Sequence, residues 1–160
     1  MGISNVAFLR YPDQSLEDND DFREKIVRAI RQYRPEIVFS MDPNRQYVIH
    51  RDHRMCGRVT LDAVFPFARD HLSYPQHLLE GLEPHKVREV YLWGSDNPDT
   101  FLDISATMDR KMDALYCHVS QVGVRGEDER MTRWYKRHEE FGKRIGVRYA
   151  EAFKRIELPG

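Results

Sequence analysis

A continuous apolar run, EIVFS at residues 36–40, constrains the fold more than any other stretch of the chain. A run without polar alternation is typical of a strand buried on both faces of a parallel sheet. The preceding segment, residues 16–35, begins with acidic residues, repeats Phe22 and Ile26 at helical spacing and ends at a proline, which predicts a helix. A shorter apolar run at residues 5–9 predicts another strand before this helix. Strand, helix and strand in this order indicate a βαβ unit and a mostly parallel α/β sheet.

The rest of the chain continues to alternate helices and strands. Its patterns predict a helix over 52–64, a covering loop with a short helix over 65–86, a strand over 87–93, a strand or edge segment over 101–105, a helix over 106–117 and an amphipathic helical tail over 127–157. No repeat or linker interrupts the chain, so we expect a single domain over residues 1–160. The few strands found predict a Rossmann-like sheet, with helices on both faces, that lacks its N-terminal strand–helix units.

Net charge, cysteine content and the length of apolar runs limit the classes of function that this chain can have. The 160 residues carry a net charge of −1, which does not favour electrostatic capture of nucleic acid or an anionic membrane. Cys56 and Cys117 form no CxxC pair, so two reduced thiols are expected. No apolar run has the length of a membrane span, and the N-terminus lacks the pattern of a signal peptide. We therefore expect a cytoplasmic protein.

Two histidines flank an aspartate in the sequence HRDH, shortly after the 36–40 strand. In open α/β sheets, functional groups collect beyond the carboxyl ends of the strands. If a helix begins near Asp52, His50 and His53 lie within one turn and can face one cavity, one as a metal ligand and the other as a donor to a developing oxyanion. The alternative is a chance pair on a surface helix with Asp52 as its N-cap. Spacing alone leaves both open.

Several stretches together resemble one family, the LmbE-like or PIG-L zinc-dependent de-N-acetylases of N-acetylglucosamine-type conjugates. The matching stretches are FLRYPDQSLED (8–18), RPEIVFSMDP (34–43), HRDHRMCGR (50–58), EGLEPHKVREVYLWG (80–94), LDIS (102–105), KMDALYCHVSQ (111–121) and EAFKRI (151–156). The similarity runs nearly end to end in the family's order. It implies an LmbE-like α/β domain and a metal-dependent amide hydrolase that acts on a small amino-sugar conjugate.

The resemblance also implies roles for individual residues. His53 would bind Zn²⁺, His50 would stabilise the tetrahedral oxyanion, and Asp52 would orient His50. Further residues would line the substrate pocket: Asp42, Arg45, Tyr47, His118 and Gln121. For His118 the alternative is a partly buried histidine with a satisfied hydrogen bond and no contact with substrate.

Two departures from the family pattern stand out. Arg51 occupies the place of the proline in the usual HPDHR sequence, and no AHPDDE-type motif is present. By resemblance, that motif supplies a zinc-binding histidine and aspartate and the general base. A catalytic zinc normally has three protein ligands, so we expect an N-terminally truncated family member with very low activity by itself.

Three hypotheses follow. The first is a zinc-dependent deacetylase. The second is a non-catalytic module that binds sugar or mediates contacts in a homo-oligomer, since the charged segment at 125–144 also carries aromatic residues. The third is a site whose remaining residues come from another polypeptide.

Overall fold

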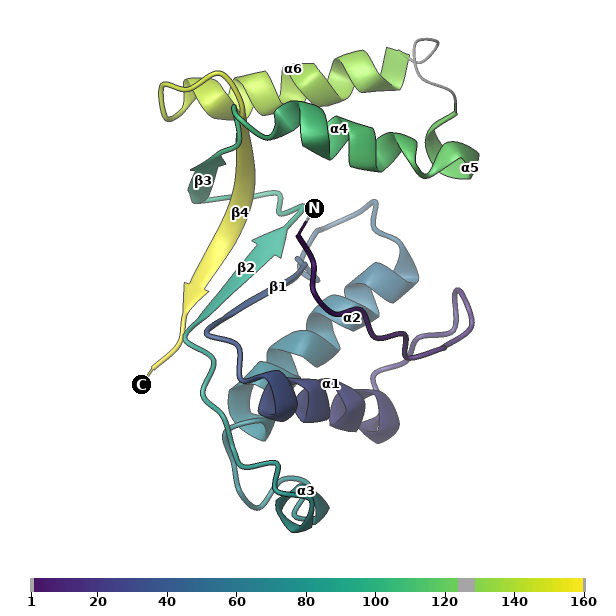
Figure 1. Ribbon diagram of the computed structural model, residues 1–160, viewed down its shortest axis with the longest axis vertical. Helices are drawn as coiled ribbons and strands as arrows, with labels where there is room; N and C mark the ends of the chain where they lie inside the picture. The colour runs from purple at the N-terminus through teal and green to yellow at the C-terminus, as the bar shows by residue number, and fades with distance from the viewer. Residues whose placement is uncertain (1, 124–128, 160) are drawn as a thin grey trace. The chain divides into compact units, whose positions relative to one another are not determined.

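The computed structural model describes residues 2–123 and 129–159. The chain forms two compact units: unit 1 contains Met1–Ala7 and Asp99–Ala152, and unit 2 contains Phe8–Pro98 and Phe153–Gly160. In chain order (Figure 1) the elements are α1 (Asp20–Tyr33), β1 (Ile37–Met41), α2 (Arg51–Asp62), η1 (Ala63–Phe67), α3 (Gln76–Leu79), β2 (Glu89–Trp93), β3 (Thr100–Asp103), α4 (Met108–Tyr116), α5 (Val119–Val122), α6 (Glu129–Lys143) and β4 (Ala150–Glu157). Among the described helices, none has the length and apolarity that a membrane span requires.

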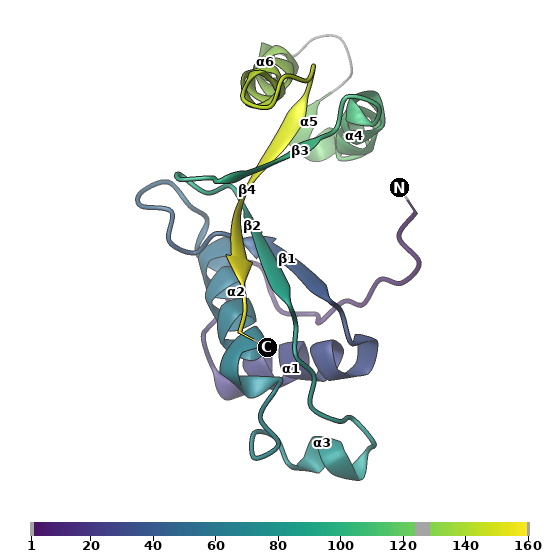
Figure 2. The same ribbon diagram turned by 90° about the vertical axis from the view of Figure 1, so that its left-hand side faces the viewer.

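Unit 2 is built around a parallel pair of strands. β1 and β2 run in the same direction with Phe39 opposite Tyr91, and the second part of β4 pairs antiparallel to β2 with Phe153 opposite Trp93. Figure 2 shows β4 running against β2. The long connection from β1 to β2, which contains α2, is the crossover that parallel strands require. The α/β class predicted from the sequence is confirmed.

Helices α1 and α2 supply the core of unit 2. The side chain of Asn19 caps α1 by accepting a hydrogen bond from Phe22 N at 2.9 Å, and α1 ends at Arg34 in a left-handed conformation. The apolar sides of the helices pack with one face of the strands, in a cluster of Val27, Ile30, Ala63, Val64, Ala68, Tyr74, Val87, Val90 and Leu92. Each large apolar side chain buried in this way contributes about 1.5–3 kcal/mol.

A buried arginine fixes the segment between η1 and α3. Arg31 on α1 is 2% exposed, and its guanidinium donates to the backbone carbonyls of Phe67, Ala68, Asp70, Ser73 and Tyr74. Burial lowers the pKa of Arg31, although arginine stays charged at any physiological pH. His77 touches the same guanidinium at 3.3 Å and bonds to Glu24 at 3.1 Å on its other side. This network holds the covering segment that leads into β2.

A glycine brings α2 unusually close to the end of β1. A Cβ atom on Gly57 would lie 2.4 Å from the carbonyl oxygen of Met41 and 3.0 Å from the Cδ of Pro43. Real Cβ atoms do not approach backbone oxygens so closely, so this contact requires a residue without a side chain. The close approach sets the first turn of α2 beside the carboxyl ends of the parallel strands.

We expect Gly57→Ala to lower the free energy of unfolding by about 1–2 kcal/mol. Alanine favours a helix by about 0.5–1 kcal/mol over glycine, but overpacking against rigid backbone lies toward the upper end of a cost of about 1–3 kcal/mol. Urea unfolding followed by circular dichroism measures the change. Arg58→Ala, at an exposed position of the same helix, is the control and should change stability by less than about 0.5 kcal/mol. A Gly57→Ala protein as stable as the wild type would contradict the packing argument.

Unit 1 has its own core. β3 lies beside the first part of β4, and α4 and α6 pack through a cluster of Met108, Met112, Met131 and Tyr149. Lys111 on α4 forms an ion pair with Glu151 on β4. His138 on α6 is buried; its Nδ1 lies 2.7 Å from the carbonyl oxygen of Trp134, to which it donates.

Burial lowers the pKa of His138 below its ordinary value of 6.5. The unfolded chain therefore binds a proton at this histidine more readily than the folded chain does. The contribution of the buried neutral ring to the free energy of unfolding is present above about pH 6.5 and is lost as the pH falls. We expect the free energy of unfolding to decrease from pH 7 to pH 5 by more in the wild type than in His138→Phe. Equal pH slopes in parallel denaturation series would contradict this.

Three sequence predictions are wrong. Residues 5–9 form no strand; Val6 and Phe8 are exposed, because an apolar run becomes a strand only when another strand pairs with it. The tail predicted as a helix over 127–157 is helical only to Lys143 and then forms β4, whose backbone pairs with β2; residues 127 and 128 lie outside the described residues. The run at 36–40 is not buried on both faces. It forms β1 at the end of the strand order, with Ile37 43% and Phe39 57% exposed.

Candidate active site

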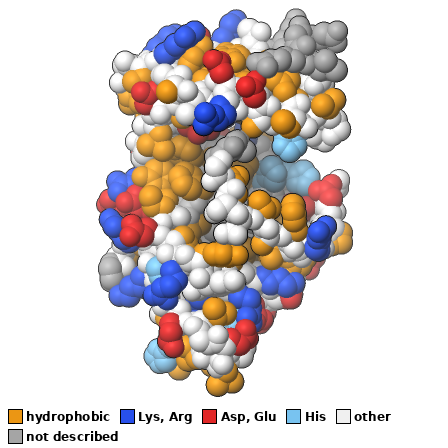
Figure 3. All heavy atoms as spheres, in the orientation of Figure 1, with side chains coloured by type: hydrophobic (Ala, Val, Ile, Leu, Met, Phe, Trp, Pro, Cys, Tyr) orange, Lys and Arg blue, Asp and Glu red, His pale blue; other side chains and the backbone are white. Residues whose placement is uncertain are grey.

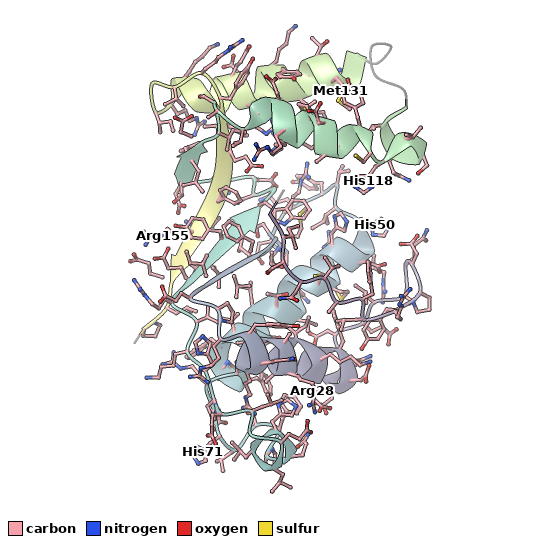
Figure 4. All side chains as sticks on the ribbon, viewed as in Figure 1. Arg28, His50, His71, His118, Met131 and Arg155 are labelled. Atoms are coloured by element: carbon pink, nitrogen blue, oxygen red, sulfur yellow. The ribbon has the colours of Figure 1, made fainter. Side chains whose placement is uncertain are left out.

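The histidine pair lies at the carboxyl ends of the parallel strands in unit 2. The loop after β1 leads into α2, whose first turn contains the sequence HRDH. Parallel strands end at the same edge of a sheet, so the loops that follow β1 and β2 meet there. Figure 4 shows His50 at the N-terminal end of α2, away from His71 between η1 and α3.

His50 is the N-cap of α2. Its Nδ1 accepts a hydrogen bond from the backbone N–H of Asp52 at 3.2 Å. A neutral imidazole that accepts at Nδ1 carries its proton at Nε2, so this bond selects the tautomer with a donor at Nε2. Asp52, the alternative predicted for the cap of this helix, does not hold that position; His50 does.

His53 lies one turn further along and is exposed. Its ring is 5.4 Å from the His50 ring and meets the ring of Trp93 edge-on at 5.7 Å, both measured between ring centroids. Trp93 ends β2 and is itself 44% exposed. The two imidazoles and the indole therefore form one contiguous group whose atoms remain accessible to a ligand.

The Asp52 carboxylate faces away from the His50 ring and toward the loop before α1. One oxygen accepts from Gln14 N at 2.6 Å, and the other accepts from Leu16 N at 3.2 Å. Asp52 thus reaches His50 through its backbone N–H, while its side chain holds the loop. The orienting role implied by the family resemblance stays a prediction, and the bond that could perform it is a backbone bond.

The three further residues predicted after β1 have different environments. Asp42 is buried, and its side chain accepts from Asn44 N at 2.9 Å, which shapes the turn. Arg45 Nε lies 3.6 Å from Asp96 in the loop after β2. Tyr47 is 84% exposed. Asp42 supports the loop, Arg45 faces the neighbouring loop, and Tyr47 is free to contact a ligand.

His118 and Gln121 lie in unit 1, where His118 is the N-cap residue of α5. Both residues are exposed, so the alternative of a partly buried His118 is not what the structure shows. The carbonyl oxygen of His118 accepts from Gln121 N at 2.8 Å. Contact of either side chain with substrate stays a prediction.

Two structural contributors were not predicted from the sequence. Asp96 accepts from Gln46 N at 3.1 Å as well as pairing with Arg45, and it joins the loops after β1 and β2. Its position just beyond a predicted strand, parallel to the first, was the available signal. The loop at Gln14–Leu16 carries no such signal, because its contacts with α2 depend on backbone groups rather than on residue types.

Among the described residues, no group of three or more histidine, cysteine, aspartate or glutamate side chains is arranged to hold a metal ion. The site contributes two imidazoles from one helical turn. A catalytic zinc requires three protein ligands and an open position. The described residues by themselves therefore do not fit a complete zinc site.

Comparison with known proteins shows which family this chain resembles. Residues 1–64 match the family described as "PIG-L: GlcNAc-PI de-N-acetylase". Diacetylchitobiose deacetylase of Thermococcus kodakarensis is 33% identical over 159 residues, which cover 96% of this chain and 57% of that protein. The resemblance to the PIG-L family is confirmed.

Two further relatives support the family assignment. The probable N-acetyl-alpha-D-glucosaminyl L-malate deacetylase 2 of Bacillus cereus is 29% identical over 130 residues, covering 80% of this chain and 55% of that protein. The solved structure of N,N'-diacetylchitobiose deacetylase from Pyrococcus horikoshii, complexed with its inhibitor MPG, superposes with a TM-score of 0.89 at 27% identity, covering 98% of this chain and 58% of that one. The chain thus spans just over half the length of these relatives.

We expect His50→Ala to lower the free energy of unfolding by about 1 kcal/mol, because the N-cap acceptor of α2 is lost. His50→Asn restores an acceptor and should recover most of the loss. His53→Ala, one turn away, is the control and should change stability by less than about 0.5 kcal/mol. Urea unfolding distinguishes the three variants, and equal effects of His50→Ala and His50→Asn would contradict the cap.

Proposed function

We propose that this chain carries part of the catalytic site of a zinc-dependent deacetylase that removes acetyl groups from N-acetylglucosamine-type conjugates. The observation that carries the proposal is the bond from Asp52 N to His50 Nδ1, which leaves a hydrogen-bond donor at Nε2. The names of the relatives support the reaction class, since two of them are deacetylases of acetylated amino sugars.

The chemistry requires such a donor. Hydrolysis of an acetamide adds water to the carbonyl carbon, passes through a tetrahedral oxyanion, and then breaks the C–N bond to give acetate and a free amine. A preorganised donor directed at the oxyanion is worth about 10²–10³ in kcat. His50 fits this role because its ring is held at one nitrogen by the helix and is exposed at the other.

Zinc dependence is part of the proposal. When bound, zinc would supply an activated water for amide hydrolysis, and His53 would be one of its ligands. Trp93 meets the His53 ring edge-on, which supports one side of the imidazole. The other protein ligands and the general base would have to come from outside the described residues.

The remaining assignments follow the same proposal. Tyr47 and Trp93 are aromatic and exposed beside the loops, which suits stacking against a sugar ring. Cys56 and Cys117 are both free thiols, in keeping with a reducing cytoplasm.

A second candidate is a non-catalytic module. The lack of a three-ligand group among the described residues favours it, as does the exposed side chain of Phe39 on β1. Phe39 forms one aromatic cluster with the half-buried Tyr91 and the buried Phe153, with ring centroids 5.2–5.7 Å apart. Figure 3 shows apolar side chains gathered over β2 and β4. A surface of this kind suits contacts with another protein chain.

Titration with Zn²⁺ tests the proposal. We expect the purified chain to bind Zn²⁺ weakly, and His53→Ala to lose at least tenfold in affinity because one imidazole ligand is removed. His71→Ala removes an exposed histidine elsewhere in unit 2 and should bind as the wild type does. Isothermal titration calorimetry gives the affinities, and acetate release from N,N'-diacetylchitobiose gives the activity, which we expect to be very low for this chain alone.

The outcomes separate the two candidates. Equal Zn²⁺ affinity in the wild type and His53→Ala would overturn the metal role of His53. No Zn²⁺ binding at all, together with concentration-dependent self-association, would favour the non-catalytic module.

A further inference from the structure

The loop before α1 is bound to the first turn of α2 through an aspartate. The Asp52 carboxylate accepts from Gln14 N at 2.6 Å through one oxygen and from Leu16 N at 3.2 Å through the other. Two oxygens of one carboxylate thus receive the N–H groups of residues two apart in the loop. Side chains at a helix N-terminus usually bond to their own helix, so this use of Asp52 is distinctive.

The neighbouring arginine binds the carbonyl groups of the same loop. Arg51 Nη1 donates to the carbonyl oxygen of Gln14 at 3.4 Å and to that of Leu16. Its Nη2 lies 3.7 Å from the Glu17 carboxylate. Arg51 and Asp52, with the loop residues Gln14 and Leu16, form what we call the loop clamp. In the clamp a guanidinium meets two carbonyls and a carboxylate meets two N–H groups.

The loop needs such support. Gln14 has a φ of 62°, in the left-handed region that residues with a side chain rarely adopt. Gln14 lies inside a turn that is closed by hydrogen bonds from Ser15 to the carbonyl oxygen of Pro12. Backbone strain of this kind persists only where surrounding contacts fix it. The clamp supplies hydrogen bonds to the N–H and the carbonyl of Gln14 itself and to those of Leu16, two residues later.

One residue joins the clamp to the candidate active site. Asp52 holds the loop with its carboxylate and bonds to His50 Nδ1 with its backbone N–H. A shift of the loop that displaces Asp52 would therefore disturb the bond that orients the His50 ring. By the resemblance, the family usually has proline where this chain has Arg51, and proline has no side-chain donor.

We propose that Arg51 is a positioning residue: with the Asp52 carboxylate it fixes the loop at Gln14–Leu16, and through Asp52 this loop is coupled to the orientation and tautomer of His50. The proposal rests on the proposed function in giving His50 a catalytic task, but the clamp itself involves only residues of unit 2. Arg51 adds to this chain a restraint that the proline of the usual pattern cannot provide.

The test is NMR spectroscopy on the uniformly ¹⁵N-labelled chain without metal or substrate. Arg51→Pro removes the guanidinium while keeping a residue that is favoured in the first turn of a helix. We expect about tenfold faster amide hydrogen exchange at Gln14 and Leu16. The two imidazole ¹⁵N shifts of His50, well separated in one fixed tautomer, should move toward each other.

Two further variants extend the test. Asp52→Asn should change both readouts in the same direction. Arg51→Lys should recover part of the effect, because lysine keeps a donor without the fork of arginine.

Arg58→Ala removes an exposed cation from the same helix and should leave both readouts unchanged. Faster loop exchange with unchanged His50 shifts in Arg51→Pro would overturn the coupling, and unchanged exchange would overturn the clamp. If Asp52→Asn does not fold, Arg51→Pro and Arg51→Lys still show whether the loop and the His50 ring are coupled. Since no metal is present, failure here leaves the Zn²⁺ titration unaffected, and failure of that titration leaves the clamp unaffected.

Discussion

The close contact between α2 and the end of β1 organises unit 2. Gly57 permits the helix backbone to approach the Met41 carbonyl more closely than any side chain would allow. That approach places the first turn of α2, with His50 and His53, at the carboxyl edge of the parallel strands. At this edge the His53 ring also meets Trp93, at the end of β2.

Much of the scaffold could be predicted from local patterns. The helix at α1, the strand at β1 and the start of α2 follow from apolar periodicity, capping and proline, which act within a few residues. The wrong predictions concern which apolar stretches pair with another strand. Residues 5–9 and the segment 150–157 are both short apolar stretches, and only the second finds a strand to pair with. Strand formation depends on distant partners, which a local pattern cannot reveal.

The candidate site likewise contains features that a local pattern predicts and features that depend on distant partners. His50 and His53 were recognised from their spacing and from family resemblance, and the structure brings their rings to 5.4 Å. The capping bond of His50 and the hold of Asp52 on Gln14 and Leu16 could not be predicted, because they join side chains to backbone groups that carry no sequence signature. Asp52 therefore bonds to His50 through its backbone N–H, whereas its carboxylate bonds to the loop.

The exposed flank of β1 has a practical consequence. Its backbone is the outermost in the strand order, and Ile37 and Phe39 project from it into water. Natural edge strands are usually blunted by lysine, proline or a bulge, and none of these interrupts Ile37–Met41. An edge strand with apolar neighbours offers its amide and carbonyl groups for pairing with a further strand. A lysine introduced at position 39 would disfavour such pairing between copies of the chain.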